Sequence, residues 1–389
     1  MRTAARRLMS VFIAAASVAA CSSSKPSTPG TTAAPAAGAT TTPATSTGTA
    51  PAKVGHVFII MLENKGYDET WGAGASSTYL NTTLRAQGQL LTNYYGIGHA
   101  SLDNYIAQIS GQSPNPNTQG DCPVYSDFAT TGTGTDGQEL GSGCVYPSNV
   151  KTIADQLSGA GRTWKSYQED MANGLVAPKT CRHPDIGRAD TTLAARKGDM
   201  YATRHNPFVY FHSIIDSPSC QTNAVDLTQL GPDLASAATT PNLTYITPNL
   251  CHDGHDAPCV DGQPGGLTSA SQFLSQWVPR ILASPAYLQD GMLIVTFDEA
   301  ELAGAQADAS ACCNTPTSPN TARPGLTGPG GGRVGAVIVS AQTKAGSTNN
   351  VPYNHYALLC SIEDIFGLPH LGFAGAAGLR CFGKDVFNA

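Results

Sequence analysis

The sequence has little charge. Only 13% of its 389 residues are Asp, Glu, Lys or Arg, against about 25% in typical soluble domains. A coiled coil and a charged disordered tail are therefore excluded, because both depend on dense charge. The 22 Lys and Arg are outnumbered by 28 Asp and Glu and form no basic run. Since nucleic-acid binding relies on clustered Lys and Arg to displace counterions, we expect no nucleic-acid partner.

The N-terminus has the features of an export signal. Three arginines lie within residues 1–7, and the apolar, small-residue segment 8–20 is too short to span a bilayer. The segment ends in Val18-Ala19-Ala20-Cys21, which resembles the bacterial lipobox, in which the cysteine becomes the lipidated first residue. Ordinary cleavage without a lipid is the alternative, and Arg6-Arg7 also permits twin-arginine export. We expect an extracytoplasmic protein, either a bacterial membrane lipoprotein anchored through Cys21 or a secreted one.

Composition divides the chain into three parts. Residues 22–52 are all Ser, Thr, Ala, Pro or Gly except Lys25. Such a segment cannot bury enough apolar area to offset its ordering entropy. We therefore expect a signal peptide over 1–20, a lipidated cysteine and disordered tether over 21–52, and one globular domain over 53–389.

The 11 cysteines suit an oxidising compartment. If Cys21 carries a lipid, ten cysteines remain, an even number that permits disulfides throughout. Their connectivity cannot be read from the sequence. We expect the adjacent Cys312 and Cys313 to bond to two different partners. The plausible local pairs are Cys122 with Cys144 and Cys251 with Cys259.

Short apolar runs alternate with helical patterns along the globular part. Runs rich in β-branched residues and bounded by turn residues predict buried strands at 57–62, 164–167, 208–211, 243–246, 292–297 and 334–339. Helical spacing of apolar residues predicts helices at 102–110, 273–282 and 358–366. Strands alternating with helices predict an α/β fold, a three-layer sandwich with a mostly parallel central sheet flanked by helices. In such sheets ligands bind just past the carboxyl ends of the strands.

Two predicted strands run directly into pairs of oxygen-bearing side chains. Glu63 and Asn64 follow the first strand, and Asp298 and Glu299 follow the fifth. Either pair alone is typical of a cap on the next loop or helix. Carboxylates at the edge of a core are costly unless a cation compensates them. Because carboxylate and amide oxygens suit Mg²⁺, Ca²⁺ or Mn²⁺, the two pairs together favour a divalent metal site.

Ser101 lies at the start of a predicted helix, after a segment that contains Gly96 and Gly98. A serine there is most simply an N-cap. The functional alternative is a nucleophile that a metal activates while the helix N-terminus holds a phosphate.

Histidines follow two further elements. The predicted strand at 243–246 leads into a loop that contains His252, Asp253, His255 and Asp256. His355 lies immediately before the last predicted helix. Clustered His and Asp are typical of metal or phosphate ligands, whereas a lone histidine is more often a capping or packing residue.

In this order the segments resemble the phosphoesterase family of the alkaline-phosphatase superfamily, which contains bacterial phospholipase C-type enzymes and secreted acid phosphatases. The matching segments are 56–64, 99–105, 204–208, 248–249, 252–256, 293–299, 354–356 and 366–369. The resemblance implies an alkaline-phosphatase-like fold with one phosphoesterase catalytic domain over 53–389. Family members often have prolines beside the nucleophile, where this sequence has Ala100 and Asp103.

The resemblance also implies roles for individual residues. Ser101 would attack phosphorus, while His255 and His355 would contact the phosphate or assist the leaving group. The divalent metal cofactor would be held by Glu63, Asn64, Asp298 and Glu299. The phosphate pocket would be completed by Asn249, Asp253 and His205.

The implied activity is that of an acid phosphatase acting on phosphate monoesters, including phosphatidylinositol 3-phosphate. A phospholipase C-type phosphodiesterase is the first alternative, because the same groups can expel a diacylglycerol alkoxide. A non-catalytic surface lipoprotein that binds a ligand is the second. The expected partners are phosphate esters, among them phosphoinositides, and the membrane through the lipid anchor.

Overall fold

An eight-stranded sheet forms the centre of the globular part, with strand order β13-β2-β12-β11-β1-β10-β7-β9. The computed structural model describes residues 54–76, 78–174 and 178–389. The strands of the sheet are β1 (His56–Leu62), β2 (Gln89–Leu91), β7 (Trp164–Gln168), β9 (Ala224–Asp226), β10 (Leu243–Thr247), β11 (Gly291–Phe297), β12 (Ala336–Ser340) and β13 (Thr348–Asn349).

The middle of the sheet is parallel. β1 pairs in parallel with β10 on one side and with β11 on the other, so the carboxyl ends of these three strands lie at one edge. Only β12 runs antiparallel to its neighbours β11 and β2. All seven residues of β1 and of β11 are buried, as expected for strands covered on both faces. The prediction of a mostly parallel α/β sheet is confirmed.

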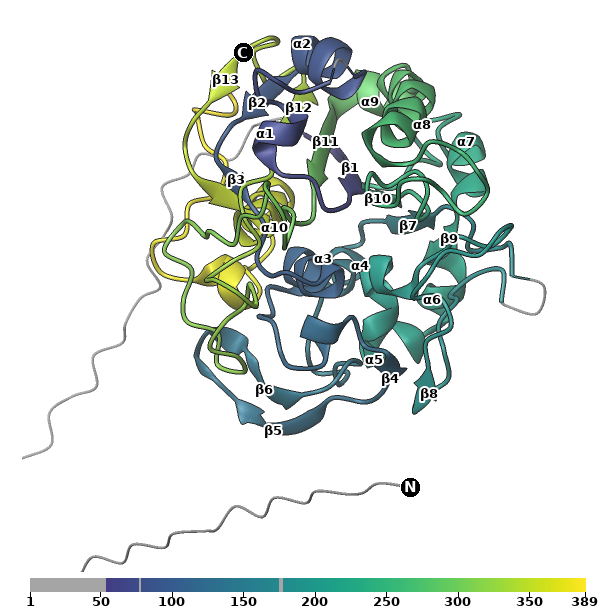
Figure 1. The fold of residues 1–389 in the computed structure, drawn as a ribbon, viewed down its shortest axis with the longest axis vertical. Helices are drawn as coiled ribbons and strands as arrows, with labels where there is room; N and C mark the ends of the chain where they lie inside the picture. The colour runs from purple at the N-terminus through teal and green to yellow at the C-terminus, as the bar shows by residue number, and fades with distance from the viewer. Residues whose placement is uncertain (1–53, 77, 175–177) are drawn as a thin grey trace, which may run out of the picture. The chain divides into compact units, whose positions relative to one another are not determined.

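Helices cover both faces of the sheet, which gives three layers (Figure 1). On one face α3 packs against α4 and α10, and on the other α9 packs against α8 and the strands β1 and β11. The helices are α1 (Tyr67–Thr70), α2 (Arg85–Gln87), α3 (Ser101–Ser110), α4 (Ile153–Gly159), α5 (His212–Ile215), α6 (Pro218–Asn223), α7 (Leu230–Asp233), α8 (Gly266–Leu282), α9 (Pro285–Asp290) and α10 (His355–Phe366). The strands outside the main sheet are β3 (Tyr94–Tyr95), β4 (Val124–Tyr125), β5 (Ala129–Thr133), β6 (Glu139–Ser142), β8 (Arg188–Ala189) and β14 (Tyr353–Asn354).

One strand prediction is wrong. The apolar run 208–211 falls largely in a 3₁₀ helix, Pro207–Tyr210. Pro207 begins this helix because its missing N–H is not needed in a first turn. Phe208 is fully buried, and a short buried run has no periodicity that separates strand from helix. The other five predicted strands and all three predicted helices are present.

The ten cysteines of the described chain form five disulfides. The two predicted local pairs, Cys122–Cys144 and Cys251–Cys259, are confirmed. The prediction for Cys312 and Cys313 is wrong, since they bond to each other. The remaining cysteines pair elsewhere and leave them no other partner. These remaining bonds are Cys181–Cys220 and Cys360–Cys381.

The predicted signal peptide, the predicted lipidation site Cys21 and the tether over 22–52 lie outside the described residues. Among the residues that are described, none of the helices is both long and apolar enough to cross a membrane.

Candidate active site

The two predicted metal-binding pairs lie side by side at the carboxyl edge of the sheet, because β1 and β11 are paired to their last residues. Glu63, Asp298 and Glu299 are at most 4% exposed. The backbone N–H of Asn64 donates to Oδ1 of Asp298 over 2.9 Å. Asn64 has a φ of 55°, a left-handed conformation that asparagine tolerates better than most residues. The bend after β1 thus turns Asn64 toward the end of β11.

The first residue of α3 reaches into this group of carboxylates. Ser101 Oγ donates to Oε2 of Glu63 over 2.7 Å. The N-cap of α3 is Ala100, and no side chain caps the helix. Ser101 is therefore not a capping serine, and its hydroxyl is directed at the carboxylate that ends β1.

Two more side chains of α3 bind the same carboxylates. Tyr105 donates its hydroxyl to Oε1 of Glu63 over 2.6 Å, and Asn104 Nδ2 donates to Oε2 of Glu299 over 3.0 Å. The sequence motifs predict no role for Asn104 or Tyr105. Their spacing was available as a signal, because positions three and four residues after Ser101 lie on the same helix face.

His205 lies between two of the buried acids. Its Nε2 is 3.4 Å from Oε2 of Glu63 and its Nδ1 is 3.8 Å from Oδ2 of Asp253. The ring stacks on Tyr105, with centroids 5.3 Å apart and planes at 9°. Burial, and then the nearby charge of Arg204, lower the pKa of His205 well below its ordinary value.

One buried arginine supplies positive charge to the site. Arg204 is 8% exposed, and its Nε lies 3.6 Å from Oδ2 of Asp121. Oδ1 of Asp121 accepts the backbone N–H of Leu102, at the start of α3, over 3.0 Å. The Arg204 charge favours the ionised forms of both Glu63 and Asp253. No motif in the sequence predicts the contact of Asp121 with Arg204.

The His255 loop closes the site on the side of β10. Asp253 is fully buried, and its carbonyl oxygen accepts the N–H of Glu63 over 2.8 Å. Oδ1 of Asp253 accepts the backbone N–H of His255 over 2.9 Å. The His255 ring is 45% exposed and lies 3.4 Å from Asp256. The loop thus buries one carboxylate among the acids and leaves an imidazole at the rim.

His355 is held behind the end of β11. Its Nε2 is 2.7 Å from the carbonyl oxygen of Asp298, and its Nδ1 is 3.0 Å from the hydroxyl of Tyr94. The ring is fully buried, and burial lowers the pKa of His355 to about 4. Both ring nitrogens are therefore occupied by the protein.

Asn249 also makes its hydrogen bonds outside the cluster of buried carboxylates. Its Nδ2 donates to Asp170 over 2.8 Å, and its Oδ1 accepts the N–H of Cys251 over 2.9 Å. The side chain of Asn249 thus shapes the loop that carries Asp253.

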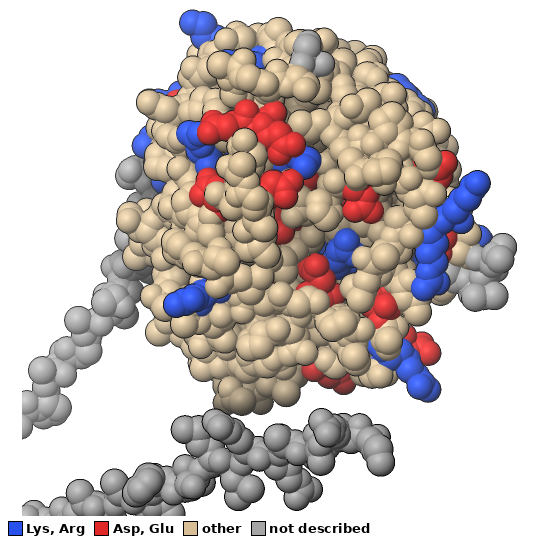
Figure 2. Space-filling view, in the orientation of Figure 1, with Lys and Arg blue, Asp and Glu red and all other residues tan. Residues whose placement is uncertain are grey.

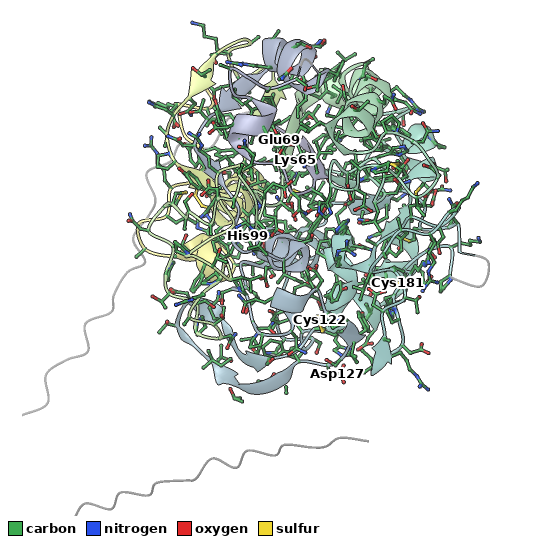
Figure 3. All side chains as sticks on the ribbon, viewed as in Figure 1. Lys65, Glu69, His99, Cys122, Asp127 and Cys181 are labelled. Atoms are coloured by element: carbon green, nitrogen blue, oxygen red, sulfur yellow. A yellow bond between two sulfur atoms is a disulfide. The ribbon has the colours of Figure 1, made fainter. Side chains whose placement is uncertain are left out.

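Acidic side chains gather over α1, above the end of β1, on the face seen in Figure 2. Lys65 lies among them, two residues after Glu63 (Figure 3). Its Nζ is 2.7 Å from Glu301 and 3.4 Å from Glu69. Lys65 therefore ties the start of α1 to the segment that follows β11.

The buried acids lack the positive charge that would balance them. Burial raises the pKa of Glu63, and it raises the pKa values of Asp253, Asp298 and Glu299 well above the ordinary range. Within the described residues, Oδ2 of Asp298 and Oδ2 of Asp253 have no hydrogen-bond partner. Carboxylates, an asparagine amide and a serine hydroxyl are hard oxygen donors. The residues present therefore fit a divalent cation such as Mg²⁺, Ca²⁺ or Mn²⁺.

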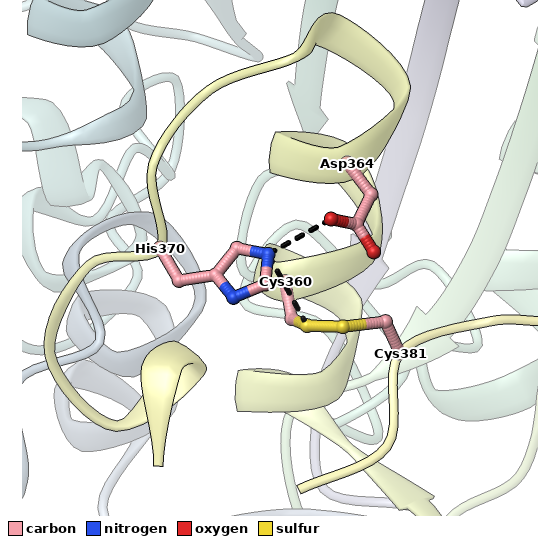
Figure 4. Close-up of side chains that lie close together, drawn as sticks. All are labelled: Cys360, Asp364, His370 and Cys381. Carbon is pink, nitrogen blue, oxygen red and sulfur yellow. Dashed lines mark hydrogen bonds and ion pairs between the residues drawn. A yellow bond between two sulfur atoms is a disulfide. The ribbon is translucent and has the colours of Figure 1, made fainter. Parts of the chain in front are cut away.

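A second group of metal-ligand residue types does not form such a site. Cys360, Asp364, His370 and Cys381 lie close together (Figure 4). The two cysteines form a disulfide, so they offer no thiolate, and His370 Nε2 is already paired with Asp364 over 2.9 Å.

Comparisons with known proteins identify the family of the chain. Residues 75–369 match the phosphoesterase family. A phosphate-repressible acid phosphatase of Penicillium chrysogenum is 27% identical over 289 residues, which are 74% of this chain and 54% of that protein. A phosphatidylinositol-3-phosphatase of Mycobacterium tuberculosis is 25% identical over 322 residues, which are 82% of this chain and 79% of that protein. A Bacteroides thetaiotaomicron protein of glycosaminoglycan metabolism has a similar fold, with a TM-score of 0.50 at 12% identity over 87% of this chain and 82% of that one.

The family match covers well over half of the chain, whereas the chain spans only 54% of the Penicillium protein's length. The resemblance to the phosphoesterase family, drawn above from the motifs, is confirmed. The chain belongs to the phosphoesterase family.

Proposed function

We propose that the protein is an extracytoplasmic phosphatase that hydrolyses phosphate monoesters with Ser101 as the nucleophile. The observation that carries the proposal is the hydrogen bond from Ser101 Oγ to Glu63, at the edge of a group of buried carboxylates. The family and the names of the acid phosphatase relatives support the same chemistry. The predicted lipid anchor at Cys21 would hold the enzyme at the bacterial cell membrane.

Each residue of the site has a part in this reaction. A divalent cation held by Glu63, Asn64, Asp298 and Glu299 would lower the pKa of the serine hydroxyl and neutralise phosphate charge. Ser101 attacks phosphorus, the bond to the leaving alkoxide breaks, and water then hydrolyses the phosphoserine. Arg204, which lies beside Asp121, stabilises the negative charge that develops on the phosphate oxygens in the transition state.

We assign proton donation to His255, because its ring is exposed at the rim. In its protonated form His255 gives a proton to the departing alkoxide. His355 has both nitrogens bonded within the protein, so we assign it the positioning of Asp298. Asp253 and His205 complete the phosphate pocket, and Asn249 supports the loop that carries Asp253.

The test is release of inorganic phosphate by the purified protein. We expect turnover of p-nitrophenyl phosphate and of phosphatidylinositol 3-phosphate, lost with chelator and restored by a divalent cation. The Ser101→Ala variant should lose at least about a thousandfold in kcat. Ser275→Ala, at an exposed position of α8, is the matched control and should retain activity. Dominant turnover of bis-p-nitrophenyl phosphate would instead assign the protein to the phospholipase C type. Absence of turnover of every ester would contradict the enzyme proposal and favour the non-catalytic, ligand-binding lipoprotein.

A further inference from the structure

The side-chain amide of Asn104 joins two parts of the candidate active site from a fully buried position on α3. Its Oδ1 accepts the backbone N–H groups of Ile97 over 2.6 Å and of Gly98 over 3.1 Å. Its Nδ2 donates to the carbonyl oxygens of Gly98 over 3.0 Å and Ala100 over 3.2 Å, and to Oε2 of Glu299 over 3.0 Å. The amide oxygen thus meets only donors, and the amide nitrogen meets only acceptors.

From these contacts we infer that Asn104 is a positioning residue, which couples the cation-binding carboxylate of Glu299 to the placement of Ser101. The inference rests on the proposed function, from which it takes the roles of Glu299 and Ser101. It adds a residue that acts through these two and that the proposed reaction does not use.

The first argument is how the start of α3 is held. Residues 97–100, here called the approach segment, lead into Ser101 and belong to no helix or strand. No side chain caps α3, so the usual fixation of a helix start by its N-cap is missing. Instead, Asn104 bonds backbone groups of three of the four residues of the approach segment. The position of Ser101 therefore depends on Asn104.

The second argument is how Glu299 is held. Its side chain is 4% exposed, and among the described residues Asn104 is the one that donates a hydrogen bond to its carboxylate. A hydrogen bond to a ligating carboxylate orients it for the cation, and its loss typically costs tenfold to a hundredfold in metal affinity or activity. Asn104 therefore limits the rotation of this carboxylate.

The third argument is close packing on the other side of the approach segment. A Cβ at Gly96 would lie 2.6 Å from the carbonyl oxygen of Asp298 and 3.2 Å from Cα of Glu299. The backbone before the approach segment thus lies directly on the residues that follow β11. Packing prevents a shift toward Glu299, because backbone cannot interpenetrate, and the Asn104 hydrogen bonds oppose a shift away from it.

The experiment compares Asn104→Ala with Asn115→Ala. Asn115 is also fully buried, and its Oδ1 also accepts two backbone N–H groups, those of Asn117 and Gly143. Its Nδ2 donates to the hydroxyl of Tyr146, however, and not to a carboxylate. The two variants therefore remove similar amides, and only one of these amides is bonded to a proposed cation ligand.

We expect Asn104→Ala to lower kcat for p-nitrophenyl phosphate about tenfold to a hundredfold and to raise the Kd for Mn²⁺ at least about tenfold. KM should change less than kcat, since Asn104 acts through Glu299 and the approach segment. Calorimetric titration with MnCl₂ measures the Kd without substrate. Asn115→Ala should lose stability but keep both kcat and Kd within about twofold of wild type.

Amide hydrogen exchange of the wild-type protein tests the same coupling if Asn104→Ala does not fold. Adding MgCl₂ should slow exchange at Ile97 and Gly98 at least about threefold, because a cation that fixes Glu299 also fixes Asn104. Exchange at Asn117 and Gly143, which Asn115 holds, should not change. Mass spectrometry of fragments that resolve these amides gives the rates.

Two results would overturn the inference and leave the proposed function standing. One is an equal loss of kcat and Mn²⁺ affinity in the Asn104 and Asn115 variants, or no loss in either. The other is exchange at Ile97 and Gly98 that does not respond to Mg²⁺. Absence of phosphate release by the wild-type protein would overturn the proposed function itself, whereas calorimetry and exchange would still report on the coupling.

Discussion

Tyr105 and Ser101 donate hydrogen bonds to the two different oxygens of one carboxylate, that of Glu63. The two donors lie one helical turn apart on α3, and the carboxylate follows β1. Glu63 is therefore fixed in orientation by the helix that carries the proposed nucleophile. A change in the tyrosine bond should reach the serine through the shared carboxylate, without contact between tyrosine and substrate.

Removing the Tyr105 hydroxyl tests this relationship. We expect Tyr105→Phe to lower kcat about tenfold, because a hydrogen bond to a charged group contributes about 1.5–3 kcal/mol and part of this orients Glu63. KM should change less than kcat, since the hydroxyl is bonded to Glu63 and not directed at the substrate. Steady-state kinetics with p-nitrophenyl phosphate measures both.

Tyr353→Phe is the matched control. Tyr353 also donates to a carboxylate over 2.6 Å, but the acceptor is Asp385, outside the site. This variant should lose stability and keep its kcat. An equal loss of kcat in both variants would show that the Tyr105 effect comes from general destabilisation.

A second prediction concerns the metal. We expect a chelator to lower the Tm by about 5 °C and a divalent cation to restore it, because ligand present at 100 times its Kd stabilises by about 2.7 kcal/mol. Asp298→Asn should remove most of this shift. Asp364→Asn, in the disulfide-linked cluster of Figure 4, should keep it in full. Thermal unfolding with and without chelator decides the matter, and a shift that survives in Asp298→Asn would place the metal elsewhere.

The carboxylate pairs could be predicted because each is a local pattern. Glu63 and Asp298 directly follow strands whose apolar runs are unambiguous, and parallel pairing then brings the strand ends together. The contact of Arg204 with Asp121 could not be predicted in this way. Asp121 follows a 3₁₀ turn with a φ of 55°, and no periodic pattern fixes the direction of such a loop.

The direction in which a side chain points is the second feature of the site that could not be predicted from the sequence. The sequence placed His355 at a helix start, where exposure to substrate and burial behind a strand are equally compatible with the pattern. The structure turns it toward the carbonyl oxygen of Asp298. Similarly, the adjacent Cys312 and Cys313 were expected to separate, because which cysteines meet depends on the tertiary fold. The two disulfides that were predicted, Cys122–Cys144 and Cys251–Cys259, join cysteines near one another in the sequence.

A third prediction concerns the end of α3. Gly111 follows the helix with a φ of 68°, and a Cβ there would lie 2.1 Å from the carbonyl oxygen of Leu371. Gly137 has nearly the same φ, 66°, with no atom within 4 Å of its Cβ position. We expect Gly137→Ala to cost about 1 kcal/mol through backbone strain alone. Gly111→Ala should cost at least about 2 kcal/mol more, because backbone must move.

Denaturant unfolding of the two glycine variants separates strain from steric clash. The Gly111 variant should also show reduced phosphate release, since α3 carries Ser101. Equal destabilisation in the two variants would mean that the segment around Leu371 yields freely, and that it does not fix the end of α3.

The fourth prediction concerns pH. His212 begins α5 and lies between two carboxylates, 3.0 Å from Asp127 and 2.9 Å from Asp216. Partial burial lowers the pKa of His212, but the hydrogen bonds to Asp127 and Asp216 outweigh burial and leave the pKa above its ordinary value. A histidine whose pKa is raised by folding stabilises the fold fully below its unfolded pKa, about 6.5, and loses this contribution as the pH rises through the folded value.

His212→Gln should therefore destabilise the protein more at pH 5.5 than at pH 8.5. The difference should be about 0.5 kcal/mol, since the carboxylates are largely exposed and water screens the pair. Denaturant unfolding of wild type and variant at both pH values measures it, and in an Asp127→Asn background the difference should shrink. A larger loss at pH 8.5 would mean that neutral His212 holds α5 by packing, and that its charge contributes nothing.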